Sequence, residues 1–208
     1  MTIPAPPSTP QYNQFLQNIT YAQGMVDAAH HMNDTLKGDL CRAAWVQAVS
    51  ALDHWVHLEV YAKAVAIVMD TSADRPTQLQ KFPMPWKYIE RIQHNREPMA
   101  TVFREALSAE LGRRTYQNYE DIGSAFQLIL PNTSASAMWN MVAQHLGMAK
   151  ADVSKRHGEV LWRRNKISHE SDVTDTVTGD RRRITQQEAA DAVHWIKQLV
   201  QALALAIR

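Results

Sequence analysis

Residues 39–69 read DLCRAAWVQAVSALDHWVHLEVYAKAVAIVM, a long stretch with a regular helical pattern. Its apolar residues recur mostly at every third or fourth position, the spacing of one face of an α-helix. They are Leu40, Ala44, Val49, Leu52, Val56 and Val60. The stretch therefore predicts one long helix with a continuous apolar face.

Helical patterns also dominate on either side of this stretch. Pro76 ends the long helix, and Pro83 and Pro85 predict a loop because proline excludes regular helix. The last helix is expected to begin at Thr185, where Thr-Gln-Gln-Glu has the form of a capping box. The other expected helices cover residues 11–34, 86–93, 98–112, 118–129, 134–147 and 151–168. The sequence predicts an all-α, single-domain helical bundle with additional short helices.

Composition limits the class of protein. An apolar content of 45% in 208 residues is enough for one core, which we assign to residues 11–208, after a proline-rich, flexible arm at residues 1–10. The start lacks the pattern of a signal peptide, and no apolar run approaches the roughly 20 residues that span a bilayer. We therefore expect a cytoplasmic protein that does not associate with a membrane.

The single cysteine, Cys41, excludes an internal disulfide framework and is expected to be a buried packing residue.

Asp53 and His57 lie four residues apart in the long helix and so share one face. The pair is either part of a solvated face or an acid–histidine pair that lines a cleft and supports a nearby site. His54 next to them raises the alternative of a metal-dependent hydrolase. The chain has no His-Glu-x-x-His motif, however, and no paired Glu-x-x-His motif. We therefore expect no metal and no other cofactor.

Residues 161–170, LWRRNKISHE, place a polar cluster near the end of the helix predicted over 151–168. One interpretation is a solvated helix end, where cations such as Arg163 and Lys166 interact favourably with the helix dipole. The other is a functional site of Arg164, Asn165 and His169, in which Asn165 lies four residues from His169 and can orient its imidazole. In a regular helix Arg164 and His169 lie about 140° apart. They can meet only if the helix loosens or if a second copy contributes.

The net charge of the chain is nearly zero, so only local clusters of charge bear on nucleic acid. Arg181, Arg182 and Arg183 form a basic run that is expected to return to the same end of the bundle and, with Lys166, to contact RNA.

The segment LWRRNKISHE closely resembles the Arg-x4-6-His motif of HEPN domains in its form Arg-Asn-x-x-x-His, which matches Arg164, Asn165 and His169. Over residues 39–208, the order of an early helix, a late helix ending in the motif and a final apolar helix is similar to the branch named RiboL-PSP-HEPN. The resemblance implies a HEPN-like bundle that forms a homodimer and acts as a metal-independent endoribonuclease. It also implies a toxin or antiviral defence effector, with an antitoxin or defence-system protein as a possible partner. Ser171 stands where toxins controlled by adenylylation carry a tyrosine, which argues against that control here.

The residue types suit RNA cleavage without a metal. The 2′-hydroxyl of RNA is an internal nucleophile, so the enzyme needs a proton-transfer group and fixed positive donors. We assign proton transfer to His169, stabilisation of the transition state to Arg164, and orientation to Asn165, with Arg163 as a substitute for Arg164. The alternative is a non-catalytic helical module that binds a protein or nucleic-acid partner through its basic cluster.

Overall fold

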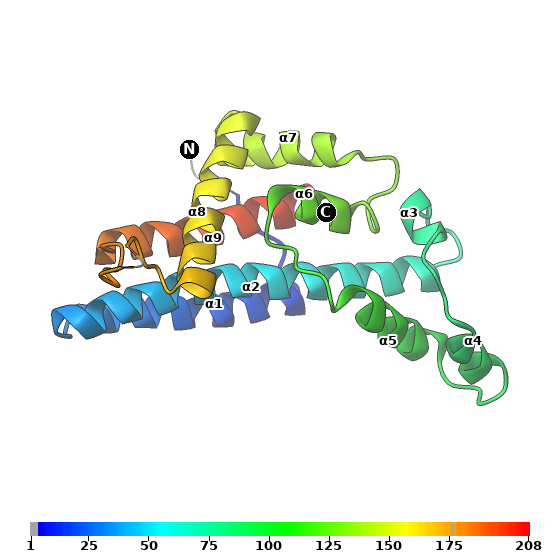
Figure 1. Ribbon diagram of the computed structural model, residues 1–208. Coiled ribbons are helices and arrows are strands. Elements are labelled where there is room, and N and C mark those ends of the chain that lie inside the picture. The colour runs from blue at the N-terminus through cyan, green and yellow to red at the C-terminus, as the bar shows by residue number, and fades with distance from the viewer. Residues whose placement is uncertain (1–3, 176) are drawn as a thin grey trace.

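The residues that the structure describes, 4–175 and 177–208 of this computed structural model, form nine helices (Figure 1). In chain order these are α1 (Pro10–Ala29), α2 (Asp34–Met69), α3 (Thr77–Gln80), α4 (Trp86–Gln93), α5 (Met99–Leu111), α6 (Tyr119–Phe126), α7 (Ala135–Leu146), α8 (Lys150–Glu170) and α9 (Gln186–Ala206). The described residues contain no strand, and an isolated bridge joins Val173 to Arg181. The prediction of an all-α, single-domain fold is confirmed.

Side chains and prolines that are visible in the sequence fix most helix starts. A polar side chain accepts a backbone N–H of the first turn in α1, α2, α6, α7 and α9, which satisfies a donor that the helix itself leaves unpaired. At α9 the capping box is complete, because Glu188 also accepts the Thr185 N–H. A proline directly precedes each of α3, α4 and α5.

Several predicted helix boundaries were wrong. The first helix ends at Ala29 rather than at residue 34, and α2 begins at Asp34 rather than at residue 39, because Asn33 caps α2 through the Leu36 N–H. The helix that contains the polar cluster continues to Glu170, two residues beyond its predicted end. His169 therefore lies inside α8, in its last turn.

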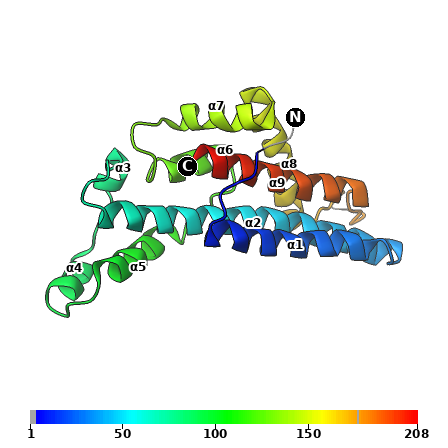
Figure 2. The same cartoon turned by 180° about the vertical axis from the view of Figure 1, so that it is seen from behind.

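The long helix α2 lies at the centre of the bundle. It packs against α1 and α9 on one side and contacts α5, α6 and α8, while α1 also contacts α9 (Figures 1 and 2). Trp55 of α2 is completely buried between the rings of Phe15 and Phe126, at centroid distances of 6.5 and 5.8 Å. A smaller cluster of Tyr88, Val102 and Ala106 joins α4 to α5.

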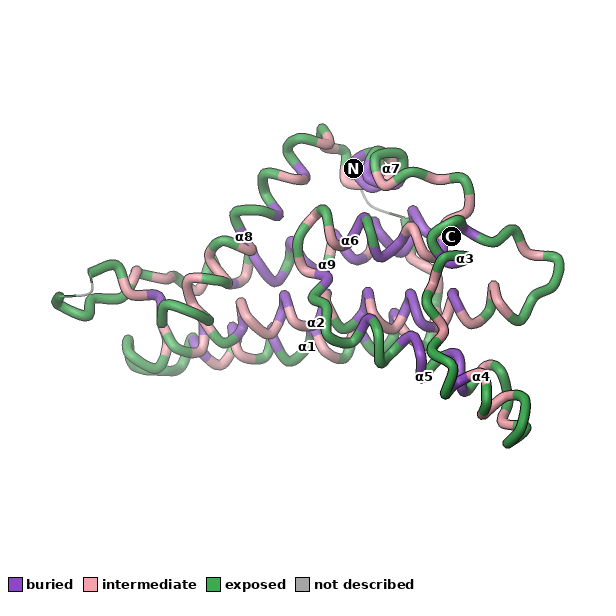
Figure 3. Tube along the Cα trace, turned by 45° about the vertical axis from the view of Figure 1, so that its right-hand side comes forward, coloured by how far each residue is buried: buried purple, intermediate pink, exposed green. Residues whose placement is uncertain are grey.

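The helix α8 crosses the bundle, and its outer face is exposed over most of its length (Figures 1 and 3). The indole Nε1 of Trp45 on α2 donates to the Val160 carbonyl at 2.9 Å, which fixes the crossing point. The C-terminal half of α8 lies beside the N-terminal part of α2, and the loop after α8 returns to the same region (Figure 1).

Residues 4–9 of the predicted arm form no helix, and Pro10 already belongs to α1. Side chains near the end of the chain bind this segment, because Gln201 donates to the Pro4 carbonyl and Arg208 to the Ala5 carbonyl. Residues 1–3 of the arm lie outside the described residues.

Candidate functional site

His169 lies in the last turn of α8 with its side chain exposed. It makes no hydrogen bond, ion pair or ring contact with any residue that the structure describes. The helix remains α-helical through Glu170, and its end is formed by Ser171 and Asp172, both in the left-handed backbone region. The imidazole is thus held on a regular helix and is open to a ligand.

Arg164 is half-buried, and its Nη1 donates to Asn165 Oδ1 at 3.0 Å. Its Nε is buried and has no hydrogen-bond partner among the described residues. Asn165 therefore orients the guanidinium of Arg164, and within the described part of the chain it makes no hydrogen bond to His169, contrary to the expectation.

A single chain does not bring Arg164 and His169 together. The helix does not loosen before His169, so the two side chains leave α8 in directions about 140° apart. Of the two routes to convergence that the sequence left open, only the contribution of a second copy is compatible with this helix.

Arg163 belongs to a partly buried ion cluster and has a structural role. Its Nη2 donates to Asp172 Oδ2 at 2.8 Å, and Arg42 of α2 donates to the same oxygen at 2.9 Å. Asp172 is fully buried, and both arginines also donate to the Arg182 carbonyl. Burial lowers the pKa of Arg163 despite the neighbouring Asp172 carboxylate. The ion cluster of Arg42, Asp172 and Arg163 ties α2, α8 and the following loop together, so Arg163 is not free to replace Arg164.

The basic run after α8 does return to the end of that helix, as the sequence suggested. Most of the residues that were expected to contact RNA already interact with other side chains, however. Lys166 forms an ion pair with Glu170, with both N···O distances 2.7 Å, and Arg181 pairs with Asp39 at 2.8 Å. The Arg182 guanidinium lies over the Trp162 ring, 5.0 Å from its centroid, and the Arg183 side chain is exposed.

Asp53 and His57 bind the segment between α5 and α6. Asp53 accepts the Tyr116 N–H at 2.6 Å and the Gln117 side-chain amide at 3.0 Å, while His57 Nε2 lies 3.2 Å from the Arg114 carbonyl oxygen. The two side chains lie 3.7 Å apart. Neither contacts Arg164 or His169, and neither points to bulk solvent. They therefore hold a loop and do not contact the polar cluster.

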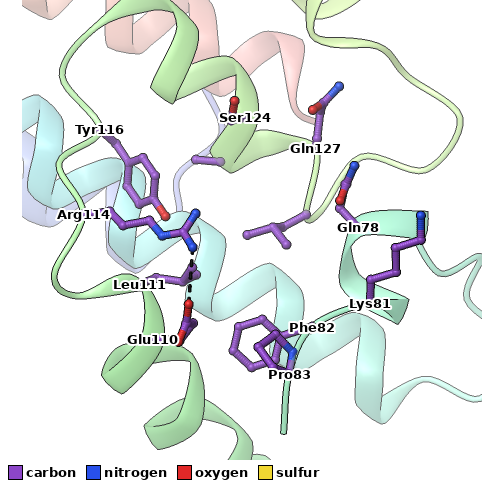
Figure 4. A pocket seen from close by; sticks show the side chains of 12 residues that line it. Gln78, Lys81, Phe82, Pro83, Glu110, Leu111, Arg114, Tyr116, Ser124 and Gln127 are labelled. Atoms are coloured by element: carbon purple, nitrogen blue, oxygen red, sulfur yellow. Dashed lines mark hydrogen bonds and ion pairs between the residues drawn. The ribbon is translucent and has the colours of Figure 1, made fainter.

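A pocket of about 350 Å³ lies beside this loop, and Figure 4 shows Tyr116 and Arg114 at one side of it and Lys81 at the other. Arg114 pairs with Glu110 across the pocket wall at 3.3 Å. Burial raises the pKa of Tyr116 to about 12, so its hydroxyl stays protonated near neutral pH. The pocket belongs to the α5–α6 side of the bundle and shares no lining residue with the end of α8.

Sequence reasoning missed His157, which is completely buried on α8. Its Nε2 lies 2.6 Å from the Gln117 carbonyl, and Trp195 Nε1 of α9 donates to its Nδ1 at 3.5 Å. Burial lowers its pKa to about 4, so the ring is neutral and donates from Nε2. The sequence does contain a pattern that indicates this burial, because His157 lies on the same face of the helix as the apolar Val153 and Val160. Through Gln117, this histidine connects Asp53 to α8.

Within residues 4–175 and 177–208, no three histidine, cysteine, aspartate or glutamate side chains gather as a metal site would require. His54, the third residue of the metal alternative, is exposed, whereas Asp53 and His57 are partly covered. The thiol of Cys41 is buried, as expected from its apolar surroundings.

Comparisons of the chain with models of protein families, with curated proteins and with solved structures found no match. None of the helices in the described residues has the length and apolar character needed to cross a bilayer.

Proposed function

We propose that this protein is a metal-independent endoribonuclease with a HEPN-like site, of the kind that serves as a toxin or antiviral effector. The observation that carries the proposal is the exposed His169 imidazole, which has no partner among the described residues and follows the Arg164–Asn165 pair on one helix. The resemblance of LWRRNKISHE to the Arg-x4-6-His motif supports the same assignment.

The proposed reaction uses the RNA 2′-hydroxyl as the nucleophile. Its oxygen forms a bond to the adjacent phosphorus, its proton passes to a neutral histidine, and the bond from phosphorus to the 5′-oxygen breaks. A protonated histidine supplies the proton for the leaving 5′-oxygen. The products are a 2′,3′-cyclic phosphate and a 5′-hydroxyl. Arg164 stabilises the charge on the phosphorane oxygens through its planar guanidinium.

The site is proposed to form between two copies of the chain. In one α8 helix Arg164 and His169 point about 140° apart, so a phosphate beside one His169 can be reached by Arg164 only from another copy. Two copies also supply two histidines, one as base and the other as acid.

The test is cleavage of total RNA in buffer that contains EDTA. His169→Ala should reduce the rate by about 10²–10⁴-fold, because proton transfer in the transition state is lost. Arg164→Ala should be comparably damaging, and Arg164→Lys should restore little, since an ammonium lacks the fork of the guanidinium. His54→Ala is the matched control, an exposed histidine on α2 that should keep full activity.

Circular dichroism should show unchanged helicity in every variant. If a folded His169→Ala protein still cuts RNA, the assignment is wrong. Loss of the cutting activity of the wild-type protein in EDTA would instead favour a metal-dependent hydrolase. RNA binding that depends on the arginines, with no cleavage by the wild-type protein, would favour a non-catalytic binding module.

A further inference from the structure

A groove of about 570 Å³ lies between the outer face of α8 and the start of α9. Trp45 and Trp162 form aromatic walls of the groove, and Lys155, Gly158, Glu159, Arg163 and Glu188 also line it. Trp162 is 49% exposed, whereas Trp55, Trp139 and Trp195 are fully buried in the core. An indole left this accessible on a rigid helix is available to a ligand.

The Trp162 ring is only partly covered. The Arg182 guanidinium lies 5.0 Å from its centroid and Lys166 Nζ 5.8 Å, yet neither residue lines the groove. Gly158, one helical turn before Trp162, leaves open space, since a Cβ placed there would meet no atom within 4 Å. The absence of a side chain at Gly158 leaves the groove open beside the indole.

His169 lies on the face of α8 that lines this groove, beyond the groove itself. Lys155, Gly158, Trp162, Lys166 and His169 follow one another at intervals of three or four residues and so lie along one face of α8. Trp162 and His169 are seven residues apart, which is about 10 Å along the helix. This distance is short enough for neighbouring nucleotides of one strand.

We propose that one unstacked base of a single-stranded RNA stacks on Trp162 in this groove, with the RNA backbone running along α8 toward His169. This proposal rests on the proposed function and adds a base-binding subsite to it. Stacking of bases on aromatic side chains is the usual way in which proteins hold single-stranded RNA. Glu159 and Glu188 line the groove and repel phosphate, so the base enters and the backbone stays outside, near Lys155.

The composition of the groove favours RNA over a second copy of the chain as its occupant. Four charged side chains line it, those of Lys155, Glu159, Arg163 and Glu188, whereas the centres of protein interfaces are depleted in charge. Trp162 is also the only large exposed apolar side chain on α8. The outer face of α8 therefore offers no broad apolar patch of the kind that marks a stable protein interface.

The experiment measures binding of a fluorescein-labelled, single-stranded 2′-O-methyl RNA by fluorescence anisotropy. This probe has no free 2′-hydroxyl and is not cut. Trp162→Ala should weaken binding about 5- to 100-fold, and Trp162→Phe should keep most of it because a phenyl ring still stacks. Trp86→Ala is the matched control, since Trp86 is 64% exposed on α4, and it should bind as the wild type does.

Lys155→Gln should weaken binding modestly and reduce the slope of log Kd against log salt by about one, as expected for one lost phosphate contact. If Trp162→Ala and Trp162→Phe both bind like Trp86→Ala, the subsite proposal is wrong. A fall in molar mass by light scattering, with no change in RNA affinity, would assign Trp162 to an interface between copies and also overturn it.

The two proposals fail in different ways. His169→Ala should bind the 2′-O-methyl probe as tightly as the wild type while losing cleavage. If cleavage depends on His169 but RNA binding does not depend on Trp162, only the subsite proposal is wrong. If binding depends on Trp162 but the wild-type protein cuts no RNA, the ribonuclease proposal falls and the groove stands as an RNA-binding site.

Discussion

His157 combines a full set of hydrogen bonds with complete burial. Its ring donates to the Gln117 carbonyl and accepts from the Trp195 indole, so it needs no charge to satisfy either nitrogen. A protonated ring would lose the Trp195 hydrogen bond and place a positive charge in the core. Burial, which disfavours this charge, lowers the pKa of His157 to about 4.

The lowered pKa predicts that acid destabilises the fold through His157. Between the ordinary histidine pKa of about 6.5 and about 4, the unfolded chain binds a proton and the folded chain does not. This contribution to stability is fully present above pH 6.5 and falls by about 3 kcal/mol as the pH drops through that window. The measurement is urea unfolding of the wild type and His157→Gln at several pH values.

His157→Gln should be less stable than the wild type at pH 7, because its amide fills the site imperfectly. The difference between the two proteins should then shrink steadily toward pH 4. A constant difference across this range would mean that His157 titrates normally.

The junction of α2, α8 and the loop after α8 depends on charge. Arg42 and Arg163 both donate to Asp172 Oδ2, and Gly38 leaves the room that Arg42 needs, since a Cβ there would lie 3.0 Å from Arg42 Nη1. The left-handed backbone at Asp172 turns the chain back toward α2 immediately after the helix. The position of the whole loop thus follows from one buried carboxylate.

Asp172→Asn should therefore destabilise the protein by about 3 kcal/mol, because two partly buried guanidinium groups lose their counter-charge. Asparagine tolerates the left-handed backbone, so the change tests charge rather than strain. Trypsin should also cut faster after Arg181, Arg182 and Arg183, because the loop opens more often. The measurements are urea unfolding and the rate of limited proteolysis.

Asp39→Asn is the control for this element, since Asp39 pairs with Arg181 and Arg42 at the exposed edge of the same junction. Loss of the Asp39 charge should lower the free energy of unfolding by at most about 1 kcal/mol. Equal effects of the two variants would show that burial of the Asp172 carboxylate adds nothing to its contribution to stability.

Helix starts could be predicted because their signals are local. The capping box at Thr185 and the loop at Pro83 and Pro85 follow from residues within one turn. The turn before Asn33 was missed because the apolar pattern continues across it. Pairing of Asp172 with Arg42, 130 residues earlier, leaves no local pattern at all. Sequence reasoning could thus place Arg163 and Arg164 on one helix, but it could not separate the structural arginine from the exposed cluster.

At the scale of the whole molecule, the proposed site is incomplete in one chain. The helix α8 is regular through His169, and Arg164 and His169 leave it in different directions. The turn between α1 and α2, with the exposed Met32, and the first turn of α2, with Leu36, lie at the same end of the bundle as the loop after α8 (Figure 1). This end offers apolar area for a second copy near the proposed site.

We therefore predict a homodimer whose activity needs His169 from both chains. Inactive His169→Ala protein should inhibit the wild type by exchange, because each mixed dimer has one histidine where the reaction needs both an acid and a base. With three parts of variant to one of wild type, random pairing leaves about a quarter of the wild-type chains in intact dimers, so the cleavage rate per wild-type chain should fall to about a quarter. Gel assays of the mixture after equilibration measure this rate, with His54→Ala as the control that should leave it unchanged. A rate that is unaffected by the His169→Ala protein, together with a monomeric mass in light scattering at micromolar concentration, would show that each chain works alone.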